Sequence, residues 1–291
     1  MSDLDIKARD GRRLGVHVVT QGSTGRTVVM CHAAPGSGAF DPEPEETWRR
    51  GVTLLAVDRP GYGGSDPVSG DRWATVDSAA LDIADVLEAR DAGPVGVVGW
   101  SAGGRVALAL AALRPDLVDR VVVLATPAPD EEVQWVPPEQ RASLEQLRGL
   151  PAAEVHRLLG EQLAPLVPAD PADAVGLLAS ANADSAVLAR EGVRTRVAGM
   201  LEVGFTQGAA GLAADIAGYC LRPWGFTPDQ VAAKALLLYG AADQLAGPKH
   251  GKWYQARLPD SRFEQVPGEG HLLVVPMWKR ALSHLSPNQR R

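Results

Sequence analysis

Ser101 is the residue in this chain whose setting points most directly to chemistry, because it sits at the centre of Gly99-Trp100-Ser101-Ala102-Gly103. An apolar, β-favouring run over 95–98 ends just before this pentapeptide, and apolar residues at helical spacing follow it over 106–113. We therefore predict a strand, a sharp turn and a helix. The two glycines remove side chains that would collide in so tight a turn. Such a turn exposes the serine hydroxyl at the positive N-terminus of the helix.

A serine hydroxyl is a weak nucleophile at neutral pH, so it needs a general base, and the base needs an acid to orient it. Among the six histidines, only His271 follows a late strand in a Gly-rich loop. Asp243 is the only carboxylate directly after the preceding strand, and Asp130, beyond an earlier strand, is the reserve candidate. The order Ser101, Asp243, His271 predicts nucleophilic catalysis by a serine.

Each of these residues also has a structural interpretation that remains open at this point. Ser101 could mark a plain strand-to-helix turn, and His271 could be a structural loop histidine. Asp243 could be the N-cap of the helix predicted after it. His32 is better explained by a structural hydrogen bond than by base catalysis.

The elements that must position these residues alternate between strands and helices. Leu4 to Ala8 and Leu14 to Thr20 are predicted to form a hairpin. Continuous apolar runs predict buried strands at 27–31, 54–57, 95–98 and 235–239, with further strands at 118–125 and 261–266. Helices are predicted at 76–87, 106–113, 248–258 and 276–285. This alternation predicts an α/β fold with a mostly parallel, doubly wound central sheet, whose functional groups gather at the carboxyl ends of its strands.

Residues 127–234 interrupt this pattern, because the β signal stops and apolar residues recur at helical spacing over 144–147, 155–163 and 187–202. A stretch of this length is too long for a simple connection between two strands. We predict a core domain formed by residues 1–126 and 235–291, and an inserted helical cap formed by residues 127–234.

Composition narrows the possible partners. The net charge of −6 and the lack of a basic cluster argue against nucleic acid or membrane surfaces. Two cysteines suggest no disulfide framework, and no signal-peptide core or long apolar run is present, so a cytoplasmic protein is expected. No metal constellation and no phosphate-binding glycine loop is evident, so we expect no cofactor. The sequence does not determine the oligomeric state.

Together, several motifs resemble those of α/β-hydrolase-fold serine hydrolases with an inserted helical cap, over nearly the whole chain. Gly99 to Gly104 resembles the nucleophile elbow, and the segment 32–37, His-Ala-Ala-Pro-Gly-Ser, resembles the oxyanion loop. The segment 58–65 resembles the Asp-x-x-Gly-x-Gly-x-Ser turn. The resemblance implies that the backbone N–H groups of Ala34 and Ala102 bind the oxyanion. The family's glycine after the loop histidine is Ala33 here, which could alter the loop because alanine takes positive φ at a cost.

A serine at the elbow argues against haloalkane dehalogenases and epoxide hydrolases of this fold, which the resemblance implies would carry aspartate there. Serine with histidine favours acyl transfer on a small substrate, most simply a carboxylic ester, with a lactone, thioester or amide, or C–C hydrolysis of a diketone, as further possibilities. The alternative is a small-molecule binder that keeps the triad with little turnover. Arg59 and Tyr62 are expected to support the loop. Six residues are predicted to line the substrate pocket, and packing explains those in the cap equally well: Trp100, Trp135, Phe205, Trp224, Leu245 and Leu272.

Overall fold

The computed structural model describes residues 6–179 and 181–287. Their sheet has seven strands in the order β1-β3-β2-β4-β5-β6-β7, and only β1 is antiparallel to its neighbour. The strands are β1 (Val16–Thr20), β2 (Thr27–Cys31), β3 (Thr53–Val57), β4 (Val95–Trp100), β5 (Val118–Leu124), β6 (Lys234–Gly240) and β7 (Ser261–Val266). The predicted mostly parallel sheet is confirmed.

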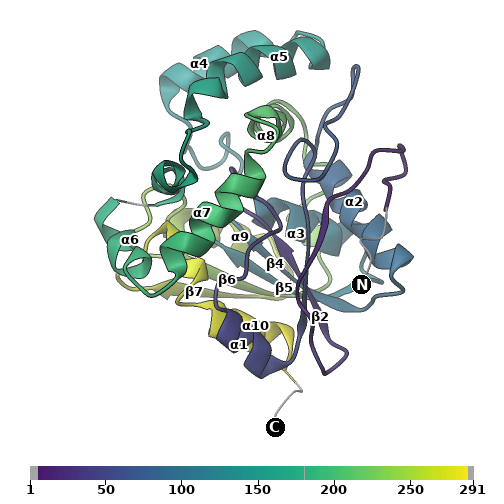
Figure 1. Ribbon diagram of the computed structural model, residues 1–291, viewed down its shortest axis with the longest axis vertical. Helices are drawn as coiled ribbons and strands as arrows, with labels where there is room; N and C mark the ends of the chain where they lie inside the picture. The colour runs from purple at the N-terminus through teal and green to yellow at the C-terminus, as the bar shows by residue number, and fades with distance from the viewer. Residues whose placement is uncertain (1–5, 180, 288–291) are drawn as a thin grey trace.

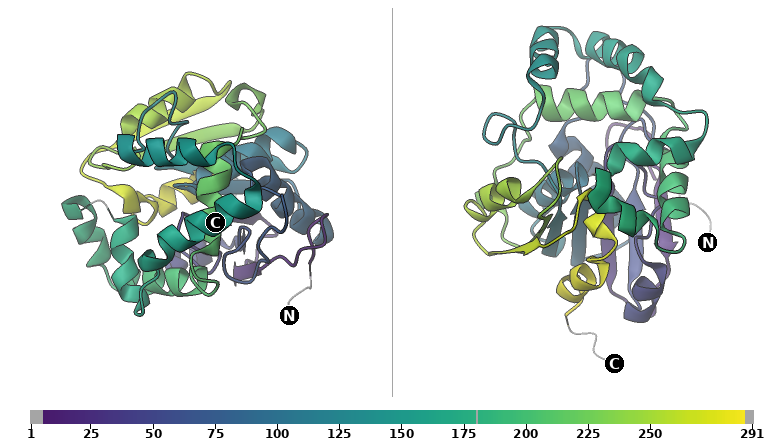
Figure 2. Two further views of the ribbon diagram at one scale, coloured as in Figure 1. Left: turned by 90° about the horizontal axis from the view of Figure 1, so that it is seen from above. Right: turned by 90° about the vertical axis from the view of Figure 1, so that its left-hand side faces the viewer.

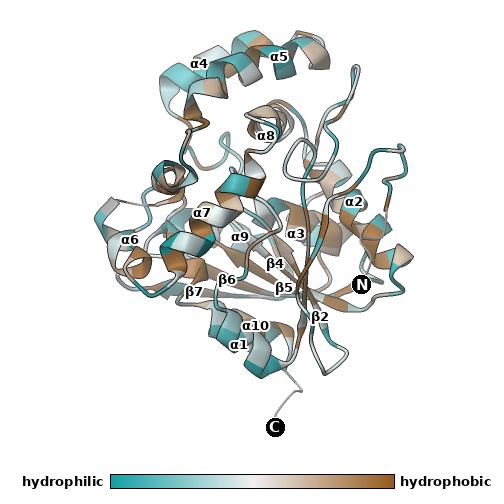
Figure 3. Cartoon of the chain, viewed as in Figure 1, coloured by the Kyte–Doolittle hydropathy of each residue, from teal (hydrophilic) through white to brown (hydrophobic). Residues whose placement is uncertain are grey.

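Alternating residues of the central strands enter two separate hydrophobic clusters, one on each face of the sheet. Val97 joins the cluster that includes residues of α2 (Val76–Ala89), α3 (Gly103–Leu113) and α9 (Pro248–Gln255). Val98 joins the cluster that includes residues of α10 (Trp278–Leu285), beside which α1 (Pro44–Arg50) packs. This burial on both faces explains why the central strands are apolar throughout. Figure 3 shows these strands as a hydrophobic centre.

Between β5 and β6, residues 127–233 contain no strand in the part that the structure describes, and Lys234, the last residue of the predicted cap, already belongs to β6. The helices of this segment are α4 (Pro138–Leu147), α5 (Ala152–Leu163), α6 (Ala181–Leu188), α7 (Val193–Gly204) and α8 (Ala210–Leu221), with 3₁₀ turns η1 (Ala164–Leu166), η2 (Pro171–Leu178) and η3 (Pro228–Gln230). In Figures 1 and 2, α4 and α5 lie farthest from the sheet, and α8 lies between them and the core. Val155 and Leu159 of α5 pack against Ala213, Ala217 and Leu221 of α8.

Some local predictions were wrong. The first half of the predicted hairpin, where it lies within the described residues, is reduced to a single bridge between Lys7 and Arg13, because β1 pairs with β3 instead. The helix predicted over 187–202 is interrupted by Gly192, whose φ of 70° places it in the left-handed region, so that α6 ends before it and α7 begins after it.

Two helices had no periodic signal in the sequence. The seven residues of α1 bury only Glu46 and Thr47, so no apolar stripe marks this helix. Helix α8 buries residues on nearly all of its faces, because it lies between α5 and the core. A helix surrounded in this way is apolar all round and has little amphipathic periodicity.

Candidate active site

Ser101 lies between β4 and α3 with φ of 54°, a left-handed conformation that is uncommon for a residue with a side chain. Glycines make this turn possible. A Cβ on Gly99 would lie 2.4 Å from the carbonyl oxygen of Gly103, and a Cβ on Gly103 would lie 2.1 Å from the carbonyl oxygen of Cys31 in β2. The turn therefore depends on close backbone contact both within itself and with the neighbouring strand.

The structure brings Ser101, His271 and Asp243 together. The Nε2 atom of His271 lies 2.9 Å from Ser101 Oγ, and its Nδ1 atom lies 2.8 Å from Asp243 Oδ2. Asp243 follows β6 and His271 follows β7, whereas Ser101 follows β4, so all three sit at carboxyl ends of parallel strands. This arrangement can take a proton from the serine hydroxyl and stabilise the imidazolium that results.

The carboxylate of Asp243 is held in place on its other side as well. Its Oδ1 atom accepts hydrogen bonds from the backbone N–H groups of Leu245 and Ala246, at 2.8 and 3.0 Å. Burial by itself would raise the pKa of Asp243, but the hydrogen bond and charge of His271, together with these two backbone hydrogen bonds, hold that pKa below its ordinary value. Helix α9 has Gly247 as its N-cap, so Asp243 closes a turn before the helix and does not cap it.

The reserve acid, Asp130, is engaged elsewhere. Its Oδ1 atom accepts from the backbone N–H groups of Trp135 and Val136, and its Oδ2 atom pairs with Arg141 at 2.6 Å. His32 also has a structural environment: its Nδ1 donates to the carbonyl of Ala33, and its Nε2 accepts from a backbone N–H. Burial, followed by the charge of Arg59, lowers the pKa of His32 well below its ordinary value, so this imidazole is neutral.

The Ala33–Ala34 peptide has a fixed orientation. The carbonyl of Ala33 accepts from His32 Nδ1 at 2.8 Å and from Arg59 Nη2 at 2.9 Å. This peptide is not among the cis bonds of the described residues, so the N–H of Ala34 points away from Arg59. Ala33 is also absent from the described residues with positive φ, which explains how alanine fits where the family has glycine. Ala34 and Ala102 both line a cavity with Ser101.

Two aspartates of the segment 127–234 were not predicted as site residues. Asp215 of α8 binds the Arg59 guanidinium with both carboxylate oxygens and accepts from Tyr62 Oη at 2.9 Å. Asp184 of α6 accepts from the backbone N–H groups of His271 and Leu272, at 3.0 and 2.9 Å. Their partners lie far away in the sequence, so no local signal could have revealed them. Arg59 and Tyr62 support the loop, as predicted.

The cavity at Ser101 has a volume of about 210 Å³ and mostly apolar walls. Of the six predicted pocket residues, only Trp135 lines this cavity. The residues that the sequence analysis missed include Arg105 and the α8 side chains of Leu212, Ile216 and Tyr219. Their spacing at 212, 216 and 219 places them on one face of α8. Only the position of α8 in the fold shows that this face lines the cavity.

The other predicted pocket residues lie elsewhere. Trp100 is fully buried, because its position in β4 directs its ring toward Phe40 in the core, and its Nε1 donates to the carbonyl of His271 at 2.9 Å. Leu272 is also fully buried in the core. Phe205 packs against the same cluster, Trp224 lines neighbouring cavities, and Leu245 is 46% exposed.

The described residues contain no group of three or more His, Cys, Asp or Glu side chains arranged to hold a metal ion. Among the same residues, no helix has the length and apolar character needed to cross a membrane.

A mostly parallel sheet with a serine in a sharp strand-to-helix turn, and with a histidine and an aspartate at the same carboxyl edge, is the architecture of an α/β hydrolase. The chain belongs to the alpha/beta hydrolase fold family, whose model matches residues 26–276. It is 27% identical over 255 residues, 85% of this chain and 87% of the relative, to the pimeloyl-[acyl-carrier protein] methyl ester esterase of Chromobacterium violaceum. It is 32% identical over 126 residues, 41% of this chain and 43% of the relative, to the 2-hydroxy-6-oxononadienedioate/2-hydroxy-6-oxononatrienedioate hydrolase of Cupriavidus pinatubonensis.

Solved structures show the same fold. A hydrolase from Pseudomonas aeruginosa PA01 superposes with a TM-score of 0.70 at 20% identity, covering 96% of both chains. An esterase from Exiguobacterium antarcticum superposes with a TM-score of 0.69 at 17% identity, covering 97% of both chains.

Proposed function

We propose that this protein is a serine hydrolase that cleaves a small acyl substrate, most simply a carboxylic ester. The observation that carries the proposal is the hydrogen-bonded series Ser101–His271–Asp243, with contacts of 2.9 and 2.8 Å, centred on a serine with φ of 54°. The esterase relative in Chromobacterium violaceum supports an ester as the substrate class. C–C hydrolysis is a second candidate, and the partial match to the Cupriavidus pinatubonensis hydrolase supports it.

In the proposed mechanism, Ser101 Oγ attacks the substrate carbonyl carbon while His271 Nε2 takes the hydroxyl proton. Asp243 holds the imidazole in the tautomer with Nδ1 protonated and stabilises the imidazolium. The N–H groups of Ala34 and Ala102 donate to the oxyanion, and such a donor contributes about 2.7–4 kcal/mol to transition-state stabilisation. His271 then protonates the leaving alcohol. A water molecule, activated in the same way, releases the acid and restores Ser101.

We assign residues 127–234 the role of a cap over this site. The support is that Trp135, Leu212, Ile216 and Tyr219 of this segment form much of the cavity wall beside Ser101. Apolar walls suit the hydrocarbon part of an acyl group. By keeping water away, they also strengthen the electrostatic interactions with the developing oxyanion.

The test of the proposal is covalent labelling with a fluorophosphonate probe, followed by mapping of the modified peptide. We expect one adduct per chain, at Ser101, together with hydrolysis of p-nitrophenyl acetate by the wild type. Both should vanish in Ser101→Ala and fall sharply in His271→Ala, with both variants still folded. Ser37 and Ser65 in neighbouring loops serve as internal controls, because they should remain unlabelled. A well-folded wild type that neither labels nor hydrolyses would favour the small-molecule binder instead.

A further inference from the structure

Arg105 is a buried cation beside the nucleophile with no anionic partner among the described residues. It lies in α3, four positions after Ser101, and is only 3% exposed. Its Nε donates to the carbonyl of Pro127 at 3.2 Å, and its side chain also hydrogen-bonds that of Tyr254, a neutral partner. By contrast, Arg59, equally buried, has both oxygens of Asp215. Burying a charge is costly unless it is paired, so an anionic acceptor would stabilise the buried guanidinium of Arg105.

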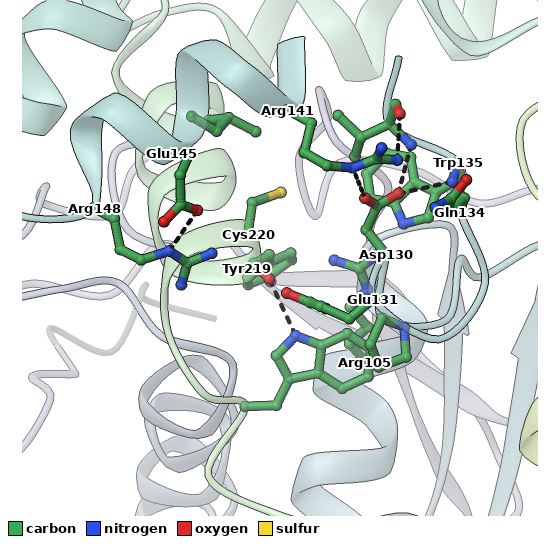
Figure 4. A pocket seen from close by; sticks show the side chains of 14 residues that line it. Arg105, Asp130, Glu131, Gln134, Trp135, Arg141, Glu145, Arg148, Tyr219 and Cys220 are labelled. Atoms are coloured by element: carbon green, nitrogen blue, oxygen red, sulfur yellow. Dashed lines mark hydrogen bonds and ion pairs between the residues drawn. The ribbon is translucent and has the colours of Figure 1, made fainter. Parts of the chain in front are cut away.

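Aromatic rings surround the Arg105 guanidinium. Its Cζ atom lies 5.3 Å from the ring centroid of Trp135, 5.5 Å from that of Tyr219 and 4.8 Å from that of Trp224. Figure 4 shows Arg105 with Trp135 and Tyr219 around it. Rings interact with the faces of a guanidinium and leave the in-plane N–H groups available for a ligand.

The position of Arg105 links the cavity at Ser101 to a second one. Arg105, Trp135, Tyr219 and Cys220 line both the cavity that contains Ser101 and a neighbouring cavity of about 230 Å³ (Figure 4). The guanidinium therefore lies at the junction of the two. A substrate held at Ser101 would reach Arg105 from within the same apolar space.

The acidic residues around these cavities are engaged elsewhere or exposed. Asp215 binds Arg59, Asp130 binds Arg141, and Glu145 binds Arg148. Glu131 lines the second cavity but is exposed and forms no ion pair with Arg105 in the described structure. Among the described residues that line these two cavities, Arg105 is therefore the cation without an ion pair.

We propose that Arg105 binds a carboxylate carried by the acyl substrate, so that this enzyme prefers esters with an anionic acyl chain, such as half-esters of short dicarboxylic acids. This inference rests on the proposed serine hydrolase function. Ser101 and Arg105 line the same cavity of about 210 Å³, so a short acyl chain can join the carbonyl at Ser101 to a carboxylate at Arg105. Arginine suits this role because its planar fork can bind both carboxylate oxygens.

The test compares p-nitrophenyl hydrogen glutarate with its neutral methyl ester, p-nitrophenyl methyl glutarate. We expect the wild type to have a kcat/KM about 10- to 100-fold higher on the anionic ester, the range expected for hydrogen bonds to a charged group. In Arg105→Met this preference should disappear, and Arg105→Lys should keep part of it. Arg148→Met is the matched control: it removes one positive charge from the neighbouring cavity, where Arg148 is paired with Glu145, and should retain the preference.

Equal losses on both esters in Arg105→Met would overturn the proposal, because they would show that Arg105 only supports the aromatic cluster. A wild type without preference would overturn it as well.

A binding experiment separates this inference from the proposed function and does not depend on an Arg105 variant folding. Calorimetric titration of Ser101→Ala with monomethyl glutarate and with dimethyl glutarate should show about tenfold or greater preference for the anion. If Ser101→Ala binds the anion preferentially but the wild type hydrolyses no ester, the Arg105 site is supported and the hydrolase function is rejected. Ester hydrolysis and Ser101 labelling without preferential binding would reject the Arg105 site alone.

Discussion

The sheet core and the inserted segment 127–234 contribute different kinds of group to the same site. The core supplies Ser101, Asp243 and His271 from the carboxyl ends of its strands. The inserted segment supplies Asp215, which holds the loop 32–37 through Arg59, and Asp184, which holds the loop of His271 through its backbone N–H groups. Strand order places the three side chains of the proposed triad, whereas carboxylates from the insertion fix the orientation of neighbouring loops.

The carboxylates of Asp215 and Asp184 bind groups of different charge. Asp215 pairs with a buried guanidinium, and both side chains are almost fully inaccessible, at 6% and 4% exposure. Removing one partner of such a pair strands a buried charge, which is far more costly than the net value of the pair. Asp184 accepts from two neutral peptide N–H groups, whose loss costs less. We therefore expect the insertion to hold the loop 32–37 more strongly than the loop of His271.

The largest expected effect comes from a substitution in the core, at Asp243. Asp243→Asn should fold normally but lose about 10⁴ in kcat, because asparagine favours the wrong histidine tautomer. Steady-state ester hydrolysis measures it. Asp130→Asn is the control and should keep most of its activity. Loss of activity in the control with a fully active Asp243→Asn would reverse the assignment of the acid.

Asp215→Leu should break the strong contact between insertion and core. It leaves Arg59 buried and unpaired, so the free energy of unfolding should fall by about 3–5 kcal/mol in urea denaturation. The double variant Arg59→Met/Asp215→Leu should recover much of that stability, yet retain a low kcat because the Ala33 carbonyl loses its Arg59 donor. A double variant with full kcat would show that this contact does not position the oxyanion loop.

Asp184→Asn should produce a smaller effect, because one oxygen still accepts while an amide N–H₂ faces the second peptide donor. We expect about 1–3 kcal/mol of destabilisation and a fall in kcat of roughly tenfold, with KM little changed. The readout that identifies a positioning role is a slower rate of fluorophosphonate labelling of Ser101, measured well below the unfolding temperature. An unchanged labelling rate in the folded variant would leave Asp184 with a purely structural role.

The smallest expected effect concerns His250, which forms a third contact between the core and the insertion. Its Nδ1 atom in α9 accepts from the backbone N–H of Ala128, and burial, followed by the charge of Lys249, lowers its pKa to about 4. Because the folded pKa is below the unfolded value of 6.5, the unfolded chain takes up this proton first as pH falls from 6.5 to 4. The free energy of unfolding therefore declines in that window.

His250→Asn keeps an acceptor for Ala128 and removes the titration. Its free energy of unfolding should decline less than that of the wild type between pH 6.5 and 4, as measured by urea denaturation at each pH. Parallel declines in the two proteins would show that His250 does not contribute to acid sensitivity.

The sequence by itself determined the sheet, the elbow and the order of Ser101, Asp243 and His271. These depend on local patterns: continuous apolar runs mark strands buried on both faces, glycines mark a turn without room for a Cβ, and functional groups follow strand ends. The predicted strands 27–31 and 261–266 match β2 and β7 residue for residue. The catalytic roles of the three residues stay a prediction until the labelling experiment is done.

Only the tertiary structure decided which side chains surround the serine. Trp100 and Leu272 lie next to catalytic positions in sequence, but strand alternation and the turn after His271 direct them into the core. Asp184 and Asp215 reach their partners across 87 and 156 positions, and Arg105 acquires its aromatic neighbours from segments that pack against α3 from outside. Contacts of this kind depend on how helices pack on the sheet, and that packing cannot be predicted from local residue patterns.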